Sequence, residues 1–158
     1  MVKEYSKIEW CCIQKNGIKL IEPNEVLGES YLDAADADLL KMQSPALKIQ
    51  NLSAYDACYN SFYAILQKAG IKCEMHDCSF EVFSLISGFG EEQVSLISVL
   101  RKNNIEIEEG LMKPKRVDGE LVEEFVATAK QVFNSLTFDK IRLIRKEIER
   151  MKKKRVRI

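Results

Sequence analysis

The chain has 158 residues, of which 46% are apolar and 30% charged, and its 24 Lys and Arg residues balance 24 Asp and Glu residues. A chain of this length is usual for one domain and buries roughly two thirds of the surface that its unfolded form exposes. It therefore needs neither a metal nor disulfides to hold a core together. The composition excludes a disordered chain, and no apolar run approaches the ~18 residues of a membrane span.

The first residues and the cysteines suggest a compartment. Residues 1–5, Met-Val-Lys-Glu-Tyr, lack the apolar segment of a secretory signal, which favours a cytoplasmic, reducing setting. Five cysteines is an odd number, so they cannot all pair within the chain. We expect free thiols.

The zero net charge conceals an asymmetry along the chain. Residues 140–158 carry ten Lys and Arg against two Glu, which leaves fourteen basic and twenty-two acidic residues in 1–139. Such a basic end indicates either an anionic partner or a solvated last helix that lies against the acidic body of its own or a neighbouring subunit.

The first segment predicts a small β-hairpin. Apolar residues in 8–13 and 18–21 flank Asn16-Gly17, a pair that tolerates the positive φ angles of tight hairpin turns. In such a strand Cys11 and Cys12 would point to opposite faces, and Trp10 would anchor the hairpin in the core. We therefore divide the chain into a hairpin appendage, residues 1–22, and a helical bundle, residues 23–158.

The rest of the chain predicts amphipathic helices with short links. One runs from Pro23-Asn24 to Ser44-Pro45, and a second is capped by Ser53 or an earlier residue and ends at Gly70. Further helices are expected over 80–86, 91–103 and 118–136 and from about Thr137, with a loop over 104–117. The predicted fold is an all-α, up-and-down bundle of four to six helices with a small N-terminal β-hairpin.

The stretch "GIKCEMHDCSF", residues 70–80, holds the only histidine of the chain. Cys73, His76 and Cys78 form a single ligand block, whereas zinc takes four ligands that usually come in two blocks. Cys58 could be a fourth ligand, but its helical stripe places it on a buried face about three turns away. We therefore expect no metal.

Catalysis is a second interpretation of this stretch. His76 with Asp77 beside it could activate a cysteine, but sequence proximity does not establish the required geometry. The plainer interpretation, a helix start capped by Asp77 with His76 packed at the turn, is favoured. The sequence contains no phosphate-loop, dinucleotide-binding, zinc-protease or nucleophile-elbow motif. It therefore predicts no cofactor and indicates no particular reaction.

Three segments together resemble the archaeal branch of the HEPN domain family: "WCCIQKNGIKLIEPNEVLGESYLDAADADLL", "SAYDACYNSFYAILQKAGIKCEMHDCSFEVF" and "LVEEFVATAKQVFNSL". The most specific part is an aromatic helix, then Gly-Ile-Lys, a polar turn and a histidine that starts the next helix. The resemblance implies a helical bundle that dimerises, and a setting in RNA-directed defence or toxin–antitoxin systems, often beside a small nucleotidyltransferase.

Many members of that family are metal-independent ribonucleases with an Arg-x(4–6)-His motif at a dimer cleft. The motif is absent here, because counting forward from Arg101 meets no histidine and counting back from His76 meets no arginine at the required spacing. The resemblance therefore implies the fold and the dimer, and it does not carry the ribonuclease activity with it.

The sequence thus predicts a HEPN-like binding domain that forms a homodimer and does not contact a membrane. Its predicted partner is a nucleotidyltransferase, RNA or a nucleotide. A divergent ribonuclease that uses His76 and a structural or interaction protein are the alternatives. The nucleic-acid-binding candidates are basic residues: Arg101, Lys102, Arg142, Arg145, Lys146, Arg150, Lys152, Lys153, Lys154, Arg155 and Arg157. For Arg101 and Lys102 the plain interpretation is a basic last helical turn favoured by the helix dipole.

Overall fold

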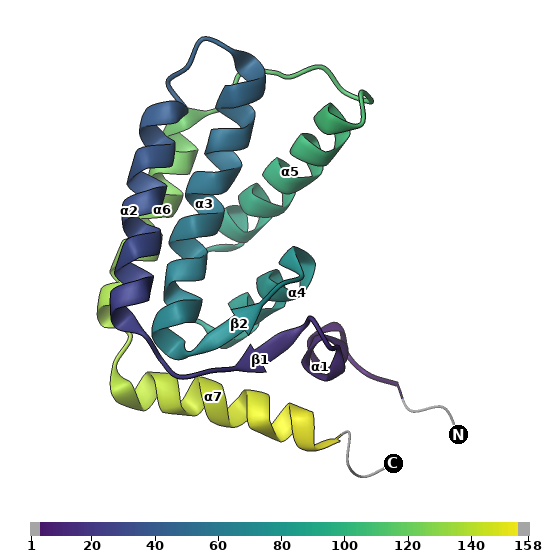
Figure 1. The fold of residues 1–158 in the computed structure, drawn as a ribbon, viewed down its shortest axis with the longest axis vertical. Coiled ribbons are helices and arrows are strands. Elements are labelled where there is room, and N and C mark those ends of the chain that lie inside the picture. The colour runs from purple at the N-terminus through teal and green to yellow at the C-terminus, as the bar shows by residue number, and fades with distance from the viewer. Residues whose placement is uncertain (1–3, 155–158) are drawn as a thin grey trace.

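The computed structural model describes residues 4–154, and these residues form a mostly helical protein with one small antiparallel sheet (Figure 1). Within this range there are seven α-helices, so the predicted number of four to six is too low. The elements in chain order are α1 Lys7–Ile13, β1 Ile18–Leu20, α2 Glu25–Lys41, α3 Leu47–Ala69, β2 Ile71–Cys73, α4 His76–Glu81, a 3-10 turn Val82–Leu85, α5 Glu91–Glu108, α6 Gly119–Ser135 and α7 Phe138–Lys153.

Helix α3 is the centre of the molecule, because α2, α5 and α6 all pack against it. Its aromatic stripe is buried as the sequence predicts: Phe62, Ile65 and Leu66 are fully inaccessible to solvent. The rings of Phe62 and Phe83 stack with centroids 4.1 Å apart. Helix α7 does not run parallel to this group but crosses the ends of α2 and α3 (Figure 1).

The predicted N-terminal hairpin is wrong. Residues 7–13 form helix α1, which begins with a capping box in which Ser6 accepts a hydrogen bond from the Glu9 amide and the Glu9 side chain bonds back to Ser6. This reciprocal cap satisfies amide groups that a helix end leaves unpaired. The Asn16-Gly17 pair, on which the hairpin prediction is based, does not indicate whether the preceding residues are helix or strand. Strand β1 pairs instead with β2, so that Ile18 faces Cys73.

The side chains of α1 differ from the predicted strand in their placement as well. Cys11 and Cys12 are both buried, rather than pointing to opposite faces of a strand. Trp10 is 37% exposed and does not anchor the core. The Asn16-Gly17 turn links α1 to β1, and a side chain at Gly17 would collide with the Cys11 carbonyl, so glycine is required there.

Helix α3 begins at Leu47 with Ala46 at the N-cap, which is one of the residues before Ser53 that the prediction allowed, although no side chain caps it. Two further boundaries differ from the prediction. The helix predicted over 80–86 begins earlier, as α4 at His76, and residues 82–85 form the 3-10 turn. Helix α5 continues to Glu108 through residues predicted as loop, because Asn104 Nδ2 donates to the carbonyls of Leu100 and Asn51 and so joins α5 to α3. Only residues 109–118 remain outside helices in that region.

The predicted starts of α2, α6 and α7 and the predicted end of α3 are confirmed. Asn24, Asp118 and Thr137 cap α2, α6 and α7 through their side-chain oxygens, as those residue types favour. Gly70 ends α3 in the left-handed conformation, at φ 73°. Within residues 4–154, none of the helices has the length and apolar character needed to cross a bilayer.

Candidate active site at His76

His76 is the first residue of α4, a helix of six residues that follows β2 directly. Two short contacts shape this turn: Cys73 Sγ lies 3.2 Å from the Met75 carbonyl, and Ser79 Oγ donates to the His76 carbonyl at 2.6 Å. The predicted Asp77 cap is not formed, since Met75 occupies the N-cap position and Asp77 lies inside the first turn.

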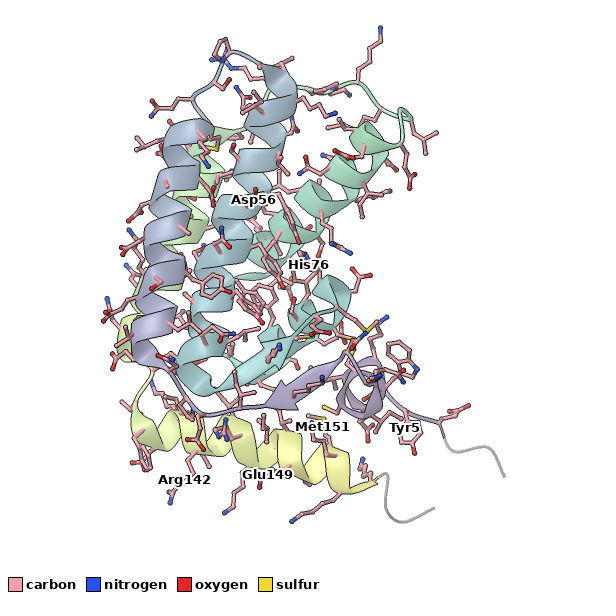
Figure 2. The ribbon with its side chains drawn as sticks, viewed as in Figure 1. Tyr5, Asp56, His76, Arg142, Glu149 and Met151 are labelled. Carbon is pink, nitrogen blue, oxygen red and sulfur yellow. A yellow bond between two sulfur atoms is a disulfide. The ribbon has the colours of Figure 1, made fainter. Side chains whose placement is uncertain are left out.

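The imidazole ring of His76 lies against two tyrosines of α3. Its Nδ1 is 2.6 Å from the Tyr55 hydroxyl, and its ring stacks on Tyr59 with centroids 4.0 Å apart and planes 4° apart. Tyr55 and Tyr59 are four residues apart on a helix, so both project from one face toward α4. The ring is half-buried, and His76 lies beside α3 (Figure 2). Among the described residues no hydrogen bond reaches its Nε2.

An arginine of α5 also reaches this site, although no Arg-x(4–6)-His spacing joins it to His76 in the sequence. Arg101 of α5 lies 3.1 Å from the Asp77 carboxylate on α4, with 27% of its side chain exposed. Its positive charge acts on both His76 and Tyr55. The sequence search missed this pairing because it looked for an arginine a few residues from the histidine, whereas the packing of α5 beside α4 supplies one from the same chain.

The surroundings of the site hold the His76 imidazole and the Tyr55 and Tyr59 phenols in their neutral forms. Burial lowers the pKa of His76 below 6.5 and the charge of Arg101 lowers it further, against a smaller opposing effect of Asp77. Burial raises the pKa of Tyr59 to about 12 and also raises that of Tyr55. At neutral pH the site therefore presents a neutral imidazole, two protonated phenols and a guanidinium, which is a proton acceptor beside a fixed positive charge.

A hollow of about 330 Å³ adjoins this arrangement along α5. Arg101 and Lys102 both line it, so the structure brings these two sequence candidates to one opening beside α4. Asp77, Glu106 and Glu109 line it as well, so the hollow carries both signs of charge. A phosphate entering it would meet a cationic edge at Arg101 and Lys102.

Arg145, another of the basic candidates, has a structural role. Its Nη1 lies 2.8 Å, 3.1 Å and 2.7 Å from the carbonyl oxygens of Ile21, Ala69 and Gly70. These carbonyls belong to the C-terminal end of α3 and to the segment that enters α2. Arg145 therefore joins α7 to the rest of the fold. Its positive charge also interacts favourably with the negative, C-terminal end of the α3 dipole.

Several other charged side chains in or next to α7 have partners within the chain. Arg142 pairs with Asp139, Arg150 with Glu147, and Lys154 with Glu9 at 2.6 Å. Burial lowers the pKa of Lys152. Lys146 and Lys153 line hollows along α7, and Arg155 and Arg157 lie outside the described residues. The basic end of the chain is thus partly used to fasten α7 to the body, while Lys146 and Lys153 remain candidates for an external anion.

The cysteines form a bond that the sequence did not suggest. Cys11 of α1 and Cys78 of α4 form a disulfide, and Cys12, Cys58 and Cys73 are buried free thiols. Free thiols are therefore present, as expected from the odd count. Within residues 4–154 no three His, Cys, Asp or Glu side chains come together in a way that could hold a metal ion.

Comparisons with known proteins identify no relative of this chain. No protein-family model, no curated protein and no solved structure matches it. The function must therefore be inferred from the side chains around His76 and from the surfaces of the fold.

Proposed function

We propose that this protein cleaves single-stranded RNA by a metal-independent reaction at His76. The observation that carries the proposal is the contact between His76 Nδ1 and the Tyr55 hydroxyl at 2.6 Å, with Arg101 held beside it by Asp77. A ring oriented at one nitrogen and open at the other is suited to proton transfer, and an adjacent guanidinium is suited to binding a phosphate.

Each group has a defined part in the proposed reaction. His76 Nε2 accepts the proton of a ribose 2′-hydroxyl, whose oxygen attacks the neighbouring phosphorus, while Nδ1–H donates to the Tyr55 oxygen and fixes the tautomer. Arg101 binds a non-bridging phosphate oxygen and opposes the charge that develops there. The bond from phosphorus to the 5′-oxygen breaks, and that oxygen takes a proton from the imidazolium, leaving a 2′,3′-cyclic phosphate and a 5′-hydroxyl.

The sequence resemblance to the HEPN family does not by itself supply this activity, because the Arg-x(4–6)-His motif is absent, so the proposal depends on the side chains around His76. That family supplies its arginine and histidine from one motif at a dimer cleft, whereas here Arg101 comes from α5 and His76 from α4 of one chain. A homodimer and a toxin–antitoxin or defence setting remain part of the proposal through this resemblance alone.

The experiment compares cleavage of a fluorescently labelled single-stranded RNA, with chelator present, by four proteins: the natural chain, His76→Gln, Arg101→Gln and Lys48→Gln. Losing a positioned proton acceptor costs roughly a hundredfold to ten-thousandfold in rate. We expect the His76 and Arg101 variants to lose most activity and the Lys48 control, an exposed residue elsewhere on α3, to keep it. Equal rates for the natural chain and the His76 variant would refute the proposal.

We further propose a protein-binding function for the surface between α5 and α6. A groove of about 560 Å³ lies there, with apolar side chains from Leu96, Val99 and Leu121 in its lining. Val99 is 49% exposed and Leu121 is 44% exposed, and the carboxylates of Glu91 and Glu124 also line the groove. A groove lined by both apolar side chains and carboxylates fits a basic amphipathic helix of a partner protein, and a nucleotidyltransferase is the partner that the sequence resemblance implies.

A synthetic helical peptide of Leu and Lys residues tests this surface, with a Leu and Glu peptide as its control. We expect the basic peptide to bind the natural chain, to bind Val99→Ser with Leu121→Ser at least tenfold more weakly, and to bind Leu40→Ser as the natural chain does. Equal binding of the acidic peptide, or no loss in the groove variant, contradicts the charge argument. A change in oligomeric state on mutating the groove would assign the surface to a second copy instead.

A further inference from the structure

The disulfide joins two short helices that are far apart in the chain. Cys11 lies in α1, which has seven residues, and Cys78 lies in α4, which has six, and the sequence separation of the two cysteines is 67. Helices this short are not stable alone in water, so each depends on what it is attached to. For α1 the other attachments include the packing of Ile8 and Cys12 on the core, the close approach of Gly17 and the ion pair of Glu9 with Lys154.

Helix α4 is equally dependent on its contacts, and it carries the candidate active site. Its first turn holds His76 and Cys78 together, and no side chain caps its N-terminus. A shift of the Cys78 backbone therefore moves the imidazole relative to Tyr55 and Tyr59, which belong to the rigid central helix α3. The disulfide is the one covalent link between α4 and an element that is not adjacent to it in the chain.

The remaining buried thiols nearby are poor partners for exchange with this bond. Burial raises the pKa of Cys12 to about 11 and also raises that of Cys73. A thiol attacks a disulfide as its thiolate, so thiols held in the protonated form react slowly. The bond is thus protected from internal rearrangement, and its state depends on thiols from outside the chain.

We propose that the Cys11–Cys78 bond is a redox-sensitive site which, while oxidised, holds α4 and His76 in place against α3, and which an external dithiol opens. In the opening step one thiolate of the dithiol attacks one sulfur of the bond and releases the other cysteine as a thiolate that takes up a proton. The second thiol of the reductant then attacks the mixed disulfide as its thiolate and releases the remaining cysteine. The dithiol is oxidised to a disulfide, and Cys11 and Cys78 each gain one electron and one proton.

Both sulfurs are fully buried, so the reductant needs local opening of the fold. Helix α1 can supply this opening, because Lys7 and Trp10 leave its outer side exposed and its few contacts can break without unfolding α3. After reduction α1 is no longer held covalently, and α4 keeps only its non-covalent contacts. Any effect of reduction on RNA cleavage rests on the proposed function, whereas the effect of the bond on the position of His76 does not.

The test uses the single histidine of the chain, whose imidazole Hε1 proton gives one NMR signal in a protein purified without a histidine tag. The full chain is titrated with acid in the oxidised form, after reduction by dithiothreitol, and as Cys11→Ser with Cys78→Ser. Cys58→Ala, which removes a free thiol of α3 and leaves the bond and α1 intact, is the control, and circular dichroism shows that each variant keeps its helices. Amide exchange in α1 is recorded alongside.

We expect reduction and the double substitution to move the pKa of His76 toward 6.5, as the ring leaves its buried place, and to speed amide exchange in α1 at least tenfold. The control should match the oxidised chain. Identical His76 signals and α1 exchange in the oxidised and reduced forms would overturn the inference, as would a natural chain in which these two thiols cannot be oxidised to a disulfide. Because neither readout measures cleavage, a failed ribonuclease assay leaves this result interpretable.

Discussion

Replacing Arg145 by methionine tests whether the basic helix α7 fastens the fold. Methionine keeps most of the side-chain length and removes the guanidinium that lies within 2.7–3.1 Å of three carbonyl oxygens. One nitrogen can direct two hydrogens, so we count two charge-assisted bonds. The net contribution of a hydrogen bond to a charged group is about 1.5–3 kcal/mol, and a cation at a helix C-terminus adds roughly 0.3–1 kcal/mol.

We therefore expect Arg145→Met to lower the free energy of unfolding by about 3 kcal/mol, with about 2 kcal/mol as the lower bound if water satisfies some of the carbonyls. The assay is urea denaturation at pH 7 followed by circular dichroism, in which the midpoint should fall while the slope stays constant. Arg142→Met is the matched control on the same helix. Its side chain is 64% exposed and pairs with Asp139 at 3.6 Å, so the expected change is within about 0.5 kcal/mol.

Equal destabilisation by the two variants would refute this account of α7. A loss below about 1 kcal/mol for Arg145→Met would do so as well, because it would mean that the three carbonyls are satisfied without the guanidinium. In either case Arg145 would return to the set of residues available to an external anion.

Three further predictions follow from particular contacts. Gly70→Ala should lower the free energy of unfolding by at least about 2 kcal/mol in urea, because residue 70 has a positive φ and a new side chain would meet Arg145 and Ile21. Phe62→Ala should cost about 3–5 kcal/mol in the same assay, since this ring is fully buried. Arg101→Gln should raise the pKa of His76 toward 6.5 in an NMR titration, so that the neutral imidazole is lost at a higher pH as the solution is acidified.

Each of these has an outcome that would contradict it. A Gly70→Ala variant as stable as the natural chain would show that the C-terminus of α3 can relax. A Phe62→Ala loss under about 1 kcal/mol would mean that the core can close the space left by the ring. An unchanged His76 pKa in Arg101→Gln would show that burial alone sets it.

The helical parts of this fold were accessible from sequence because local signals and long-range packing agree there. Helix α6 shows this: Asp118 caps it, and apolar residues at helical spacing, such as Phe125 and Phe133, are buried on one face. The end of α3 at Gly70 was predicted for the same reason, since only glycine adopts that conformation cheaply.

The N-terminal segment was mispredicted because two local signals compete in it. Asn16-Gly17 indicates a hairpin turn, whereas the capping box of Ser6 and Glu9 indicates a helix, and burial of Cys11 and Cys12 against α4 and α7 decides for the helix. A rule that weighed the Ser-x-x-Glu spacing could have found α1. The partner of β1 could not be found this way, because β2 is more than fifty residues away.

Only part of the candidate site could be predicted from the sequence, for a similar reason. His76 stood out as the single histidine, but its neighbours Tyr55 and Arg101 come from α3 and α5, and their approach depends on tertiary packing. Their spacing in the chain carries no recognisable motif. The same holds for Arg145, whose role as a cap for α3 depends on α7 crossing that helix end.

The most direct test of the proposed chemistry uses two oligonucleotides of identical sequence, one of RNA and one with a single 2′-deoxyribose replacing the ribose at the mapped cleavage position. With chelator present, we predict that the natural chain cuts the RNA to a 2′,3′-cyclic phosphate and leaves the substituted bond intact, because His76 has no 2′-hydroxyl to deprotonate there. Cleavage of the deoxy-substituted bond at the same rate, or no cleavage of either strand, would contradict the account.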